Sequence, residues 1–186
     1  MPRVRSSRRR CRPEPASVRV AALRVESRHL AAVIVLAWGG IALALVLQYW
    51  FGYEPCPWCT FQRLVYALIG LLALGAVVAK RARRISLWLS ALVPALALAG
   101  AYAAWHQHAV AARSDSCALT LADRILGAMT LPELWPAMFE ARARCDEANL
   151  PWLGIPFALW SLGLFITIAA LGLSAFRTRS NNLFLK

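Results

Sequence analysis

The sequence predicts an all-α membrane protein, a bundle of four transmembrane helices, and two observations carry that prediction. Of the 186 residues, 60% are hydrophobic and only 16% are charged, whereas soluble domains average about 25% charged residues. The charges are also unevenly placed, because residues 1–29 hold nine Arg and two Glu, 11 of the 30 charged residues. The rest of the chain cannot supply the polar surface that a soluble domain of this size needs.

Four stretches are long enough and apolar enough to cross the roughly 30 Å hydrocarbon core of a bilayer as helices of about 20 residues. Pro55–Ala79 is interrupted only by Arg63, and three stretches contain no charge at all: Leu30–Tyr53, Ile85–Trp105 and Asn149–Phe176. These uninterrupted runs exclude the alternating pattern of a membrane barrel. We therefore expect spans at about 30–50, 58–79, 85–105 and 153–176, with loops at about 51–57 and 106–152.

The distribution of Lys and Arg sets the orientation of these spans. Sixteen of the 21 lie in the N-terminal segment 1–29, the link Lys80–Arg84 and the tail 177–186. The loop 51–57 holds none, and the segment 106–150 holds four. Both termini are therefore expected to be cytoplasmic, with the two loops outside. Because the basic segment directly precedes a span, we expect it to fix topology rather than to bind nucleic acid.

Five cysteines divide between the two sides of this topology. Cys11 falls on the cytoplasmic side, where thiols stay reduced, and is expected to be a bystander. The first external loop holds Cys56 and Cys59, and the second holds Cys117 and Cys145. An even set on the oxidising face predicts two disulfides, with Cys56–Cys59 and Cys117–Cys145 the favoured pairing. A strained short-ring disulfide is typical of labile, catalytic chemistry, whereas the second pair also suits a structural staple.

The residues around Cys59 favour a reactive thiolate. Pro57 suits the first turn of a helix, so the second span is expected to begin there. Cys59 then lies where unpaired N–H groups and the helix dipole stabilise an anion. Arg63 follows on the same helix face, and an ionisable side chain at membrane depth indicates function. The alternative is that Arg63 extends to the interface.

A short helix lying along the membrane surface is expected in the second loop. Thr130-Leu-Pro-Glu133 resembles a capping box that would open it. The helix would carry four apolar side chains, Leu134, Trp135, Met138 and Phe139. Such a helix could hold Cys145 near the bilayer and so near Cys56. Ordinary packing under the loop is the alternative.

The segment Glu54-Pro-Cys-Pro-Trp-Cys-Thr-Phe-Gln-Arg63 resembles the signature of the disulfide bond formation protein B (DsbB) family. Four spans, cytoplasmic termini and a second external loop with two cysteines are similar to that family as well. Leu153-Gly154, with Trp160 following, resembles the family's approach to its fourth span. The resemblance covers the chain from about Leu30 to Phe176.

The resemblance implies a thiol:quinone oxidoreductase of the bacterial inner membrane, with its redox cysteines in the periplasm. In this family a thioredoxin-fold thiol oxidase (DsbA) is reoxidised, and the electrons pass to a membrane quinone, ubiquinone or menaquinone. By resemblance, Cys117 forms the mixed disulfide with this partner, and Cys145 then attacks Cys56. Cys59 is left as a thiolate facing the quinone, and Arg63 would hold the quinone oxygen and stabilise that thiolate.

The sequence does not decide which residues contact the quinone ring. Trp58 and Phe61 could pack on the ring, or could be ordinary interfacial aromatic residues. A histidine that some family members place near the end of the third span has no clean counterpart. His106 and His108 lie close by, but either could be an interfacial polar residue. The proline that follows Leu153-Gly154 comes early, at Pro156.

Three alternatives compete with this hypothesis. In relatives of vitamin K epoxide reductase, which are also quinone-linked thiol enzymes, the Cys-x-x-Cys follows the loop pair, whereas here it precedes it. Four external thiolates could bind Zn²⁺, but two membrane spans separate Cys56 and Cys59 from a second pair whose members are 28 residues apart. The third alternative is a non-catalytic tetraspan scaffold with structural disulfides.

Overall fold

The computed structural model describes residues 16–113, 120–149 and 151–184. Four long helices dominate it: α1 (Ala16–Phe51), α2 (Pro57–Val78), α3 (Arg83–Ala109) and α8 (Phe157–Phe184). Each contains a segment long and apolar enough to cross a membrane, which confirms the expected all-α membrane fold. α1 begins inside the basic segment 1–29, so part of that segment is helical. Cys11 and Cys117 lie outside the described residues.

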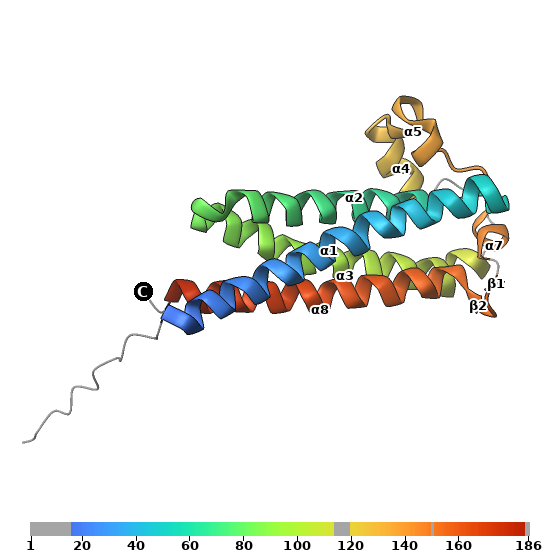
Figure 1. The fold of residues 1–186 in the computed structure, drawn as a ribbon. Helices are drawn as coiled ribbons and strands as arrows, with labels where there is room; N and C mark the ends of the chain where they lie inside the picture. Colours follow the sequence, from blue (N-terminus) through green and yellow to red (C-terminus); the bar gives the residue numbers. More distant parts are fainter. Residues whose placement is uncertain (1–15, 114–119, 150, 185–186) are drawn as a thin grey trace, which may run out of the picture.

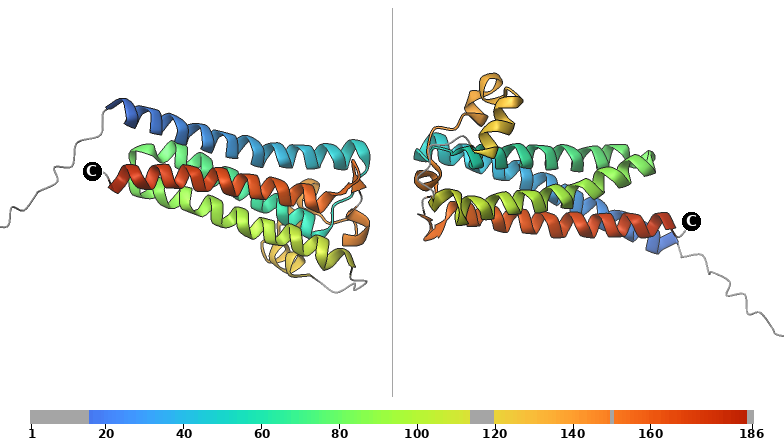
Figure 2. Two further views of the ribbon diagram at one scale, coloured as in Figure 1. Left: turned by 90° about the horizontal axis from the view of Figure 1, so that it is seen from below. Right: turned by 180° about the vertical axis from the view of Figure 1, so that it is seen from behind.

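The four long helices run side by side as a bundle (Figure 1). α1 and α3 each pack against both α2 and α8 and therefore occupy opposite corners. The start of α1 and the end of α8 lie at the same end (Figure 2). The short 3-10 turn η1 (Ala79–Arg81), between α2 and α3, lies there too, and we call this the basic end because it holds Lys80–Arg84. The cysteine end is the opposite one, where α2 begins after Cys56.

Small residues let the helices of the bundle approach closely, as is common in membranes. An added Cβ at Gly70 of α2 would lie 2.2 Å from the indole nitrogen of Trp38 on α1. An added Cβ at Gly100 of α3 would lie 2.3 Å from the ring of Phe165 on α8. Phe165 stacks in turn on Tyr66 of α2, with ring centroids 4.0 Å apart. These contacts fix α2 against α8 at the level of Tyr66.

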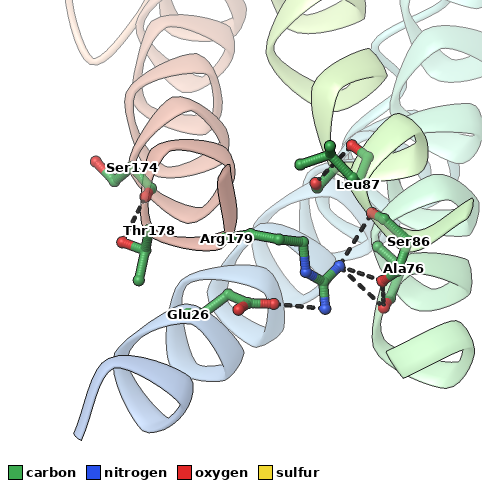
Figure 3. Close-up of polar contacts among 8 residues, drawn as sticks. Glu26, Ala76, Ser86, Leu87, Ser174, Thr178 and Arg179 are labelled. Carbon is green, nitrogen blue, oxygen red and sulfur yellow. Dashed lines mark hydrogen bonds and ion pairs between the residues drawn. The ribbon is translucent and has the colours of Figure 1, made fainter. Parts of the chain in front are cut away.

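A buried arginine, Arg179, contacts all four long helices at the basic end through one ion pair and several hydrogen bonds (Figure 3). Nη2 of Arg179, on α8, lies 2.6 Å from Oε1 of Glu26 on α1. Nη1 of the same guanidinium donates to the carbonyl oxygens of Ala76 on α2 (3.3 Å) and Ser86 on α3 (3.0 Å). It also donates to the Ser86 hydroxyl. One guanidinium therefore ties the basic end together.

Short helices of the second loop project beside α2 at the cysteine end (Figures 1 and 2). They are α4 (Leu121–Ala128), α5 (Leu131–Leu134) and α6 (Pro136–Phe139). The last short helix of the loop, α7 (Cys145–Ala148), lies instead at the end of the bundle and packs against the 3-10 turn η2 (Ala111–Arg113) (Figure 1). Leu126 of α4 and both Met138 and Phe139 of α6 form a small buried core with Leu64 of α2. The loop is thus anchored on the side of the bundle.

The capping box of this loop lies earlier in the chain than the sequence pattern suggested. Thr130 has a φ of 51° and its side chain makes no capping hydrogen bond, so the expected box at Thr130–Glu133 is wrong. The box is formed by Thr120 and Asp123 at the start of α4, where each backbone N–H donates to the other side chain, at 2.8 and 3.2 Å. The expected single helix is also divided, because Pro136 starts a separate turn, α6.

A hairpin precedes α8, where the sequence predicted a helix from residue 153. β1 (Pro151–Trp152) pairs antiparallel with β2 (Ile155–Pro156). Leu153 and Gly154 have φ values of 54° and 81°, the left-handed values that a tight hairpin turn requires. α8 therefore begins at Phe157, four residues later than expected.

Candidate redox site

Cys56 and Cys59 lie at the N-terminus of α2. Cys56 is the residue just before the helix, and Pro57 occupies its first turn, where the missing N–H of proline costs nothing. The two sulfur atoms are 3.1 Å apart. Both sulfurs thus lie where the unpaired N–H groups and the dipole of α2 favour negative charge.

The second loop brings Cys145 to this helix end. The carbonyl oxygen of Pro55 accepts hydrogen bonds from the N–H groups of Arg142 (2.9 Å) and Ala143 (3.2 Å). These bonds tie the segment before α7 to the first loop, and α7 begins at Cys145. Cys145 and the completely buried Cys56 belong to one cluster. Cys56 thus lies beside Cys59 and close enough to Cys145 for Cys56 and Cys145 each to shift the pKa of the other, so three sulfurs from two loops meet at Cys56.

Cys56 of the first loop and Cys145 of the second loop differ in acidity. Burial raises the pKa of the Cys56 thiol well above its usual value, and hydrogen bonding to Cys145 and Cys59 raises it further. The hydrogen bond from Cys56 lowers the pKa of Cys145. Cys145 is therefore the member of this pair that becomes a thiolate first, and the thiolate is the nucleophile in disulfide exchange.

Two buried glutamines connect Cys59 to α3. Nε2 of Gln107 donates to Sγ of Cys59 at 3.1 Å, and Oε1 of Gln107 accepts from Nε2 of Gln62 at 2.7 Å. Because the amide oxygen of Gln107 accepts the hydrogen bond from Gln62, the amide nitrogen of Gln107 points towards the sulfur of Cys59. Hydrogen bonds to ionised acceptors are stronger than bonds to neutral ones, so this donor favours the thiolate form of Cys59.

Arg63 is held inside the protein rather than extended to the interface. Its side chain is buried, and Nη1 donates to Oε1 of Gln48 on α1 at 2.7 Å and to the carbonyl oxygen of Met138 on α6 at 3.1 Å. Its positive charge acts on Cys59, one turn earlier in α2. Arg63 therefore joins α1, α2 and the second loop beside the sulfur cluster.

A cavity of about 320 Å³ opens beside Cys59. The residues that α2 contributes to it recur at helical spacing on one face: Cys59, Gln62, Arg63 and Tyr66. The other walls are mainly apolar and come from α1, the first loop, the hairpin and α8, among them Leu43, Leu47, Trp152, Phe157 and Trp160. The first loop also contributes Glu54 to the lining. Cys59 therefore contacts Cys56 on one side and an apolar cavity with a positive charge on the other.

The family model and the curated relatives that match this chain indicate the same protein family. A family model described as disulfide bond formation protein DsbB matches residues 26–175. The chain belongs to the DsbB family. Among curated relatives named disulfide bond formation protein B, that of Nitrosomonas europaea is 30% identical over 150 residues, which cover 80% of this chain and 92% of the relative. That of Pseudomonas syringae pv. tomato is 34% identical over 151 residues, 80% and 88% of the two chains. No solved structure is significantly similar.

Membership of the DsbB family makes the protein a membrane oxidoreductase of disulfide bond formation. The structure brings together four of the five site residues proposed from the sequence: Cys56, Cys59, Cys145 and Arg63. The fifth, Cys117, falls among residues 114–119, outside the described part of the chain.

The aromatic and histidine contacts considered from the sequence lie elsewhere. Trp58 packs against His106, with ring centroids 4.7 Å apart, and the lining of the cavity includes neither of them, nor Phe61 or His108. The aromatic residues of the lining are instead Tyr53, Tyr66, Trp152, Phe157 and Trp160.

Gln62 and Gln107 were not singled out from the sequence. One signal was available, because both are uncharged polar residues in or next to an apolar span, where such groups need partners. Gln62 directly precedes Arg63 in the signature, and Gln107 lies between His106 and His108.

Proposed function

We propose that this protein is a thiol:quinone oxidoreductase that reoxidises a periplasmic, thioredoxin-fold thiol oxidase like DsbA and passes the electrons to a membrane quinone. The observation that carries the proposal is the position of Cys59. Its sulfur is 3.1 Å from that of Cys56, which contacts Cys145, and it also lines the apolar cavity that Arg63 borders.

The cysteines would act in the order Cys117, Cys145, Cys56, Cys59. A partner thiolate attacks Cys117 of a Cys117–Cys145 disulfide, which forms the mixed disulfide and releases Cys145 as a thiolate. Cys145 attacks Cys56 of a Cys56–Cys59 disulfide, and Cys59 leaves as a thiolate. The second thiol of the partner displaces Cys117, and Cys117 then displaces Cys56 from Cys145. The partner ends oxidised, and its two electrons reside on Cys56 and Cys59.

The acidity of the sulfurs supports this direction. Cys145 is released from its disulfide with Cys117 as a thiolate, and Cys56, the sulfur that it would attack, lies in the same buried cluster. As the leaving group, Cys59 is stabilised by the N–H of Gln107 and by the charge of Arg63.

The cavity residues fit a quinone. Its mainly apolar and aromatic walls suit a substituted ring with a lipid tail, and the guanidinium of Arg63 suits a carbonyl oxygen. Arg63 and Gln62 would orient the ring, with Trp152, Phe157 and Trp160 enclosing it. When bound, ubiquinone or menaquinone would supply the two-electron oxidant for the Cys56 and Cys59 dithiol.

The charge distribution supports a location in the bacterial inner membrane with both termini in the cytoplasm. Lys80–Arg84 and Arg177 lie at the basic end, whereas the three described sulfurs of the site lie at the opposite end. With the basic end cytoplasmic, the sulfurs would face the oxidising periplasm.

The test is quinone-dependent oxidation of a reduced DsbA-like protein by the purified membrane protein. We expect one partner disulfide per quinone consumed, and loss of turnover in Cys145→Ala. Incubating Cys145→Ala with the oxidised partner should trap a mixed disulfide through Cys117, and the double variant Cys117→Ala, Cys145→Ala should trap none. A scaffold with structural disulfides would neither consume quinone nor trap a partner.

A further inference from the structure

A second polar pair lines the cavity one helical turn beyond Arg63. Oη of Tyr66, on α2, lies 2.9 Å from Oγ of Ser161 on α8 and 3.1 Å from the carbonyl oxygen of Ser161. Both residues line the cavity. Hydroxyl groups at membrane depth are costly to bury unless they are hydrogen-bonded, and an apolar contact between α2 and α8 would not need them.

The two hydroxyls can satisfy each other or offer one proton to a ligand. Each hydroxyl has one proton, rotates freely and can accept as well as donate. When Ser161 donates to Tyr66, Tyr66 donates to the Ser161 carbonyl oxygen, and both protons are used. When Tyr66 donates to Oγ of Ser161 instead, the Ser161 proton can turn towards the cavity. Rotation alone therefore switches the pair from self-satisfied to ligand-binding.

The tyrosine ring is held in a fixed place. It stacks on Phe165 with ring planes 3° apart and centroids 4.0 Å apart, and Phe165 lies against Gly100, where an added Cβ would clash. The hydroxyl of Tyr66 is thus positioned by packing across α2, α3 and α8 before any ligand arrives.

Arg63 and Tyr66 place two polar groups one helical turn apart on the cavity face of α2. Tyr66 follows Arg63 by three residues, about 4.5 Å further along the helix axis and on the same face. A para-quinone carries its two carbonyl oxygens at opposite ends of its ring. Resting on the proposed function, we propose that the hydroxyl of Ser161, which accepts from Tyr66, donates to the quinone carbonyl oxygen remote from Cys59, while Arg63 serves the near one. The site would thereby recognise both ends of a para-quinone.

The test measures quinone binding directly, with the cysteines of the protein oxidised beforehand and no reduced partner present, so that no turnover occurs. A short-chain para-benzoquinone is titrated into the purified protein, and quenching of tryptophan fluorescence reports binding because Trp152 and Trp160 line the cavity. Tyr66→Phe keeps the ring stack and removes only the hydroxyl. Ser161→Thr and Ser161→Val have the same shape and differ in the hydroxyl.

We expect the Kd to rise about threefold to tenfold in Tyr66→Phe and in Ser161→Val, the effect of one hydrogen bond. Ser161→Thr should bind like the wild type. Ser174→Ala is the matched control, since the Ser174 hydroxyl donates to the carbonyl oxygen of Ala170 on an exposed part of α8, and its Kd should not change.

Two results would overturn this inference. One is wild-type affinity in both Tyr66→Phe and Ser161→Val. The other is equal weakening in Ser161→Thr and Ser161→Val, which would show that shape and not the hydroxyl matters. In either case quinone-dependent oxidation of the partner by the wild type would leave the proposed function standing. A wild-type protein that neither binds quinone nor oxidises the partner would contradict both.

Discussion

At the scale of single residues, Cys56 controls the chemistry of its neighbours. It is completely buried, and its thiol is hydrogen-bonded with both Cys59 and Cys145. The same contact that raises the pKa of Cys56 lowers the pKa of Cys145. The protonated thiol of Cys56 thus stabilises the thiolate form of Cys145.

Removing this donor should shift the titration of Cys145. A lowered pKa means that the thiolate is already present at a pH where an ordinary thiol is protonated, so alkylation of Cys145 should reach its plateau at a lower pH. In Cys56→Ala we expect the half-maximal pH of Cys145 alkylation to move upward, towards that of an ordinary thiol. Mass spectrometry of the alkylated peptide at a series of pH values measures it. Cys56→Ser keeps an O–H donor and should shift less; equal shifts in both variants would contradict the explanation.

Gln107 should set the reduction potential of the Cys56 and Cys59 pair. Its N–H stabilises the thiolate of Cys59, which exists only when the pair is reduced. A hydrogen bond to a charged group contributes about 1.5–3 kcal/mol, so Gln107→Leu should lower the potential by about 30–60 mV. Equilibration with redox buffers of known potential measures the change. Gln62→Leu removes the contact that orients Gln107 but keeps the Gln107 donor, so in the absence of quinone the potential should change less. An unchanged potential in Gln107→Leu would refute the role.

At the scale of helices, two arginines join elements that are far apart in the sequence. Arg63 connects α1, α2 and α6 at the cysteine end, and Arg179 connects all four long helices at the basic end. Each guanidinium offers several donors in a fixed geometry, which suits the capture of several carbonyl oxygens at once.

The contact of Arg179 with Glu26 should be important for stability. Their side chains are only 10% and 5% exposed, and removing one partner of a buried pair costs about 3–5 kcal/mol because the other charge is left unpaired. We expect Arg179→Ala to lower the thermal unfolding temperature in detergent clearly, and Glu26→Gln, which keeps an acceptor, to lower it less. The exposed neighbour Arg177 is the control, and Arg177→Ala should unfold like the wild type. Equal stability of Arg179→Ala and Arg177→Ala would show that the cluster does not hold the bundle.

At the scale of the whole molecule, the two ends of the bundle should face different compartments. On a background without native cysteines, we expect a membrane-impermeant thiol reagent added to intact spheroplasts to label Leu134→Cys, in the second loop, but not Arg84→Cys, at the basic end. Permeabilised cells should label both. Labelling of Arg84→Cys in intact spheroplasts would place the basic end outside and contradict the proposed orientation.

The long helices and the start of the second one could be predicted from the sequence, because they depend on patterns of neighbouring residues along the chain. Uninterrupted apolar runs predict the four long helices because the bilayer leaves few other choices. Pro57 and the Cys-x-x-Cys motif predict the helix N-terminus at which the sulfurs lie, and Arg63 follows from helical spacing. These features depend on neighbours along the chain.

The features that were wrong or missing depend on contacts across the chain. Two Thr-x-x-acid patterns stand ten residues apart, and only the fold shows that Thr120, not Thr130, caps a helix. The turn at Leu153 and Gly154 interrupts an apolar run that reads as helix. Gln107 meets Cys59 from a separate helix, 48 positions away in the chain, so no local pattern reveals the contact.

The burial of Cys56 also has a consequence for the environment in which the protein works. Disulfide exchange requires direct access to the sulfur. Small dissolved thiols such as glutathione therefore cannot reach Cys56, because this residue is completely buried. The sulfur of Cys56 is thereby protected from direct attack by small reductants. Under the proposed function, electrons would then enter through the second loop and leave through the cavity beside the partly exposed Cys59, and the sulfur between these two routes would stay shielded.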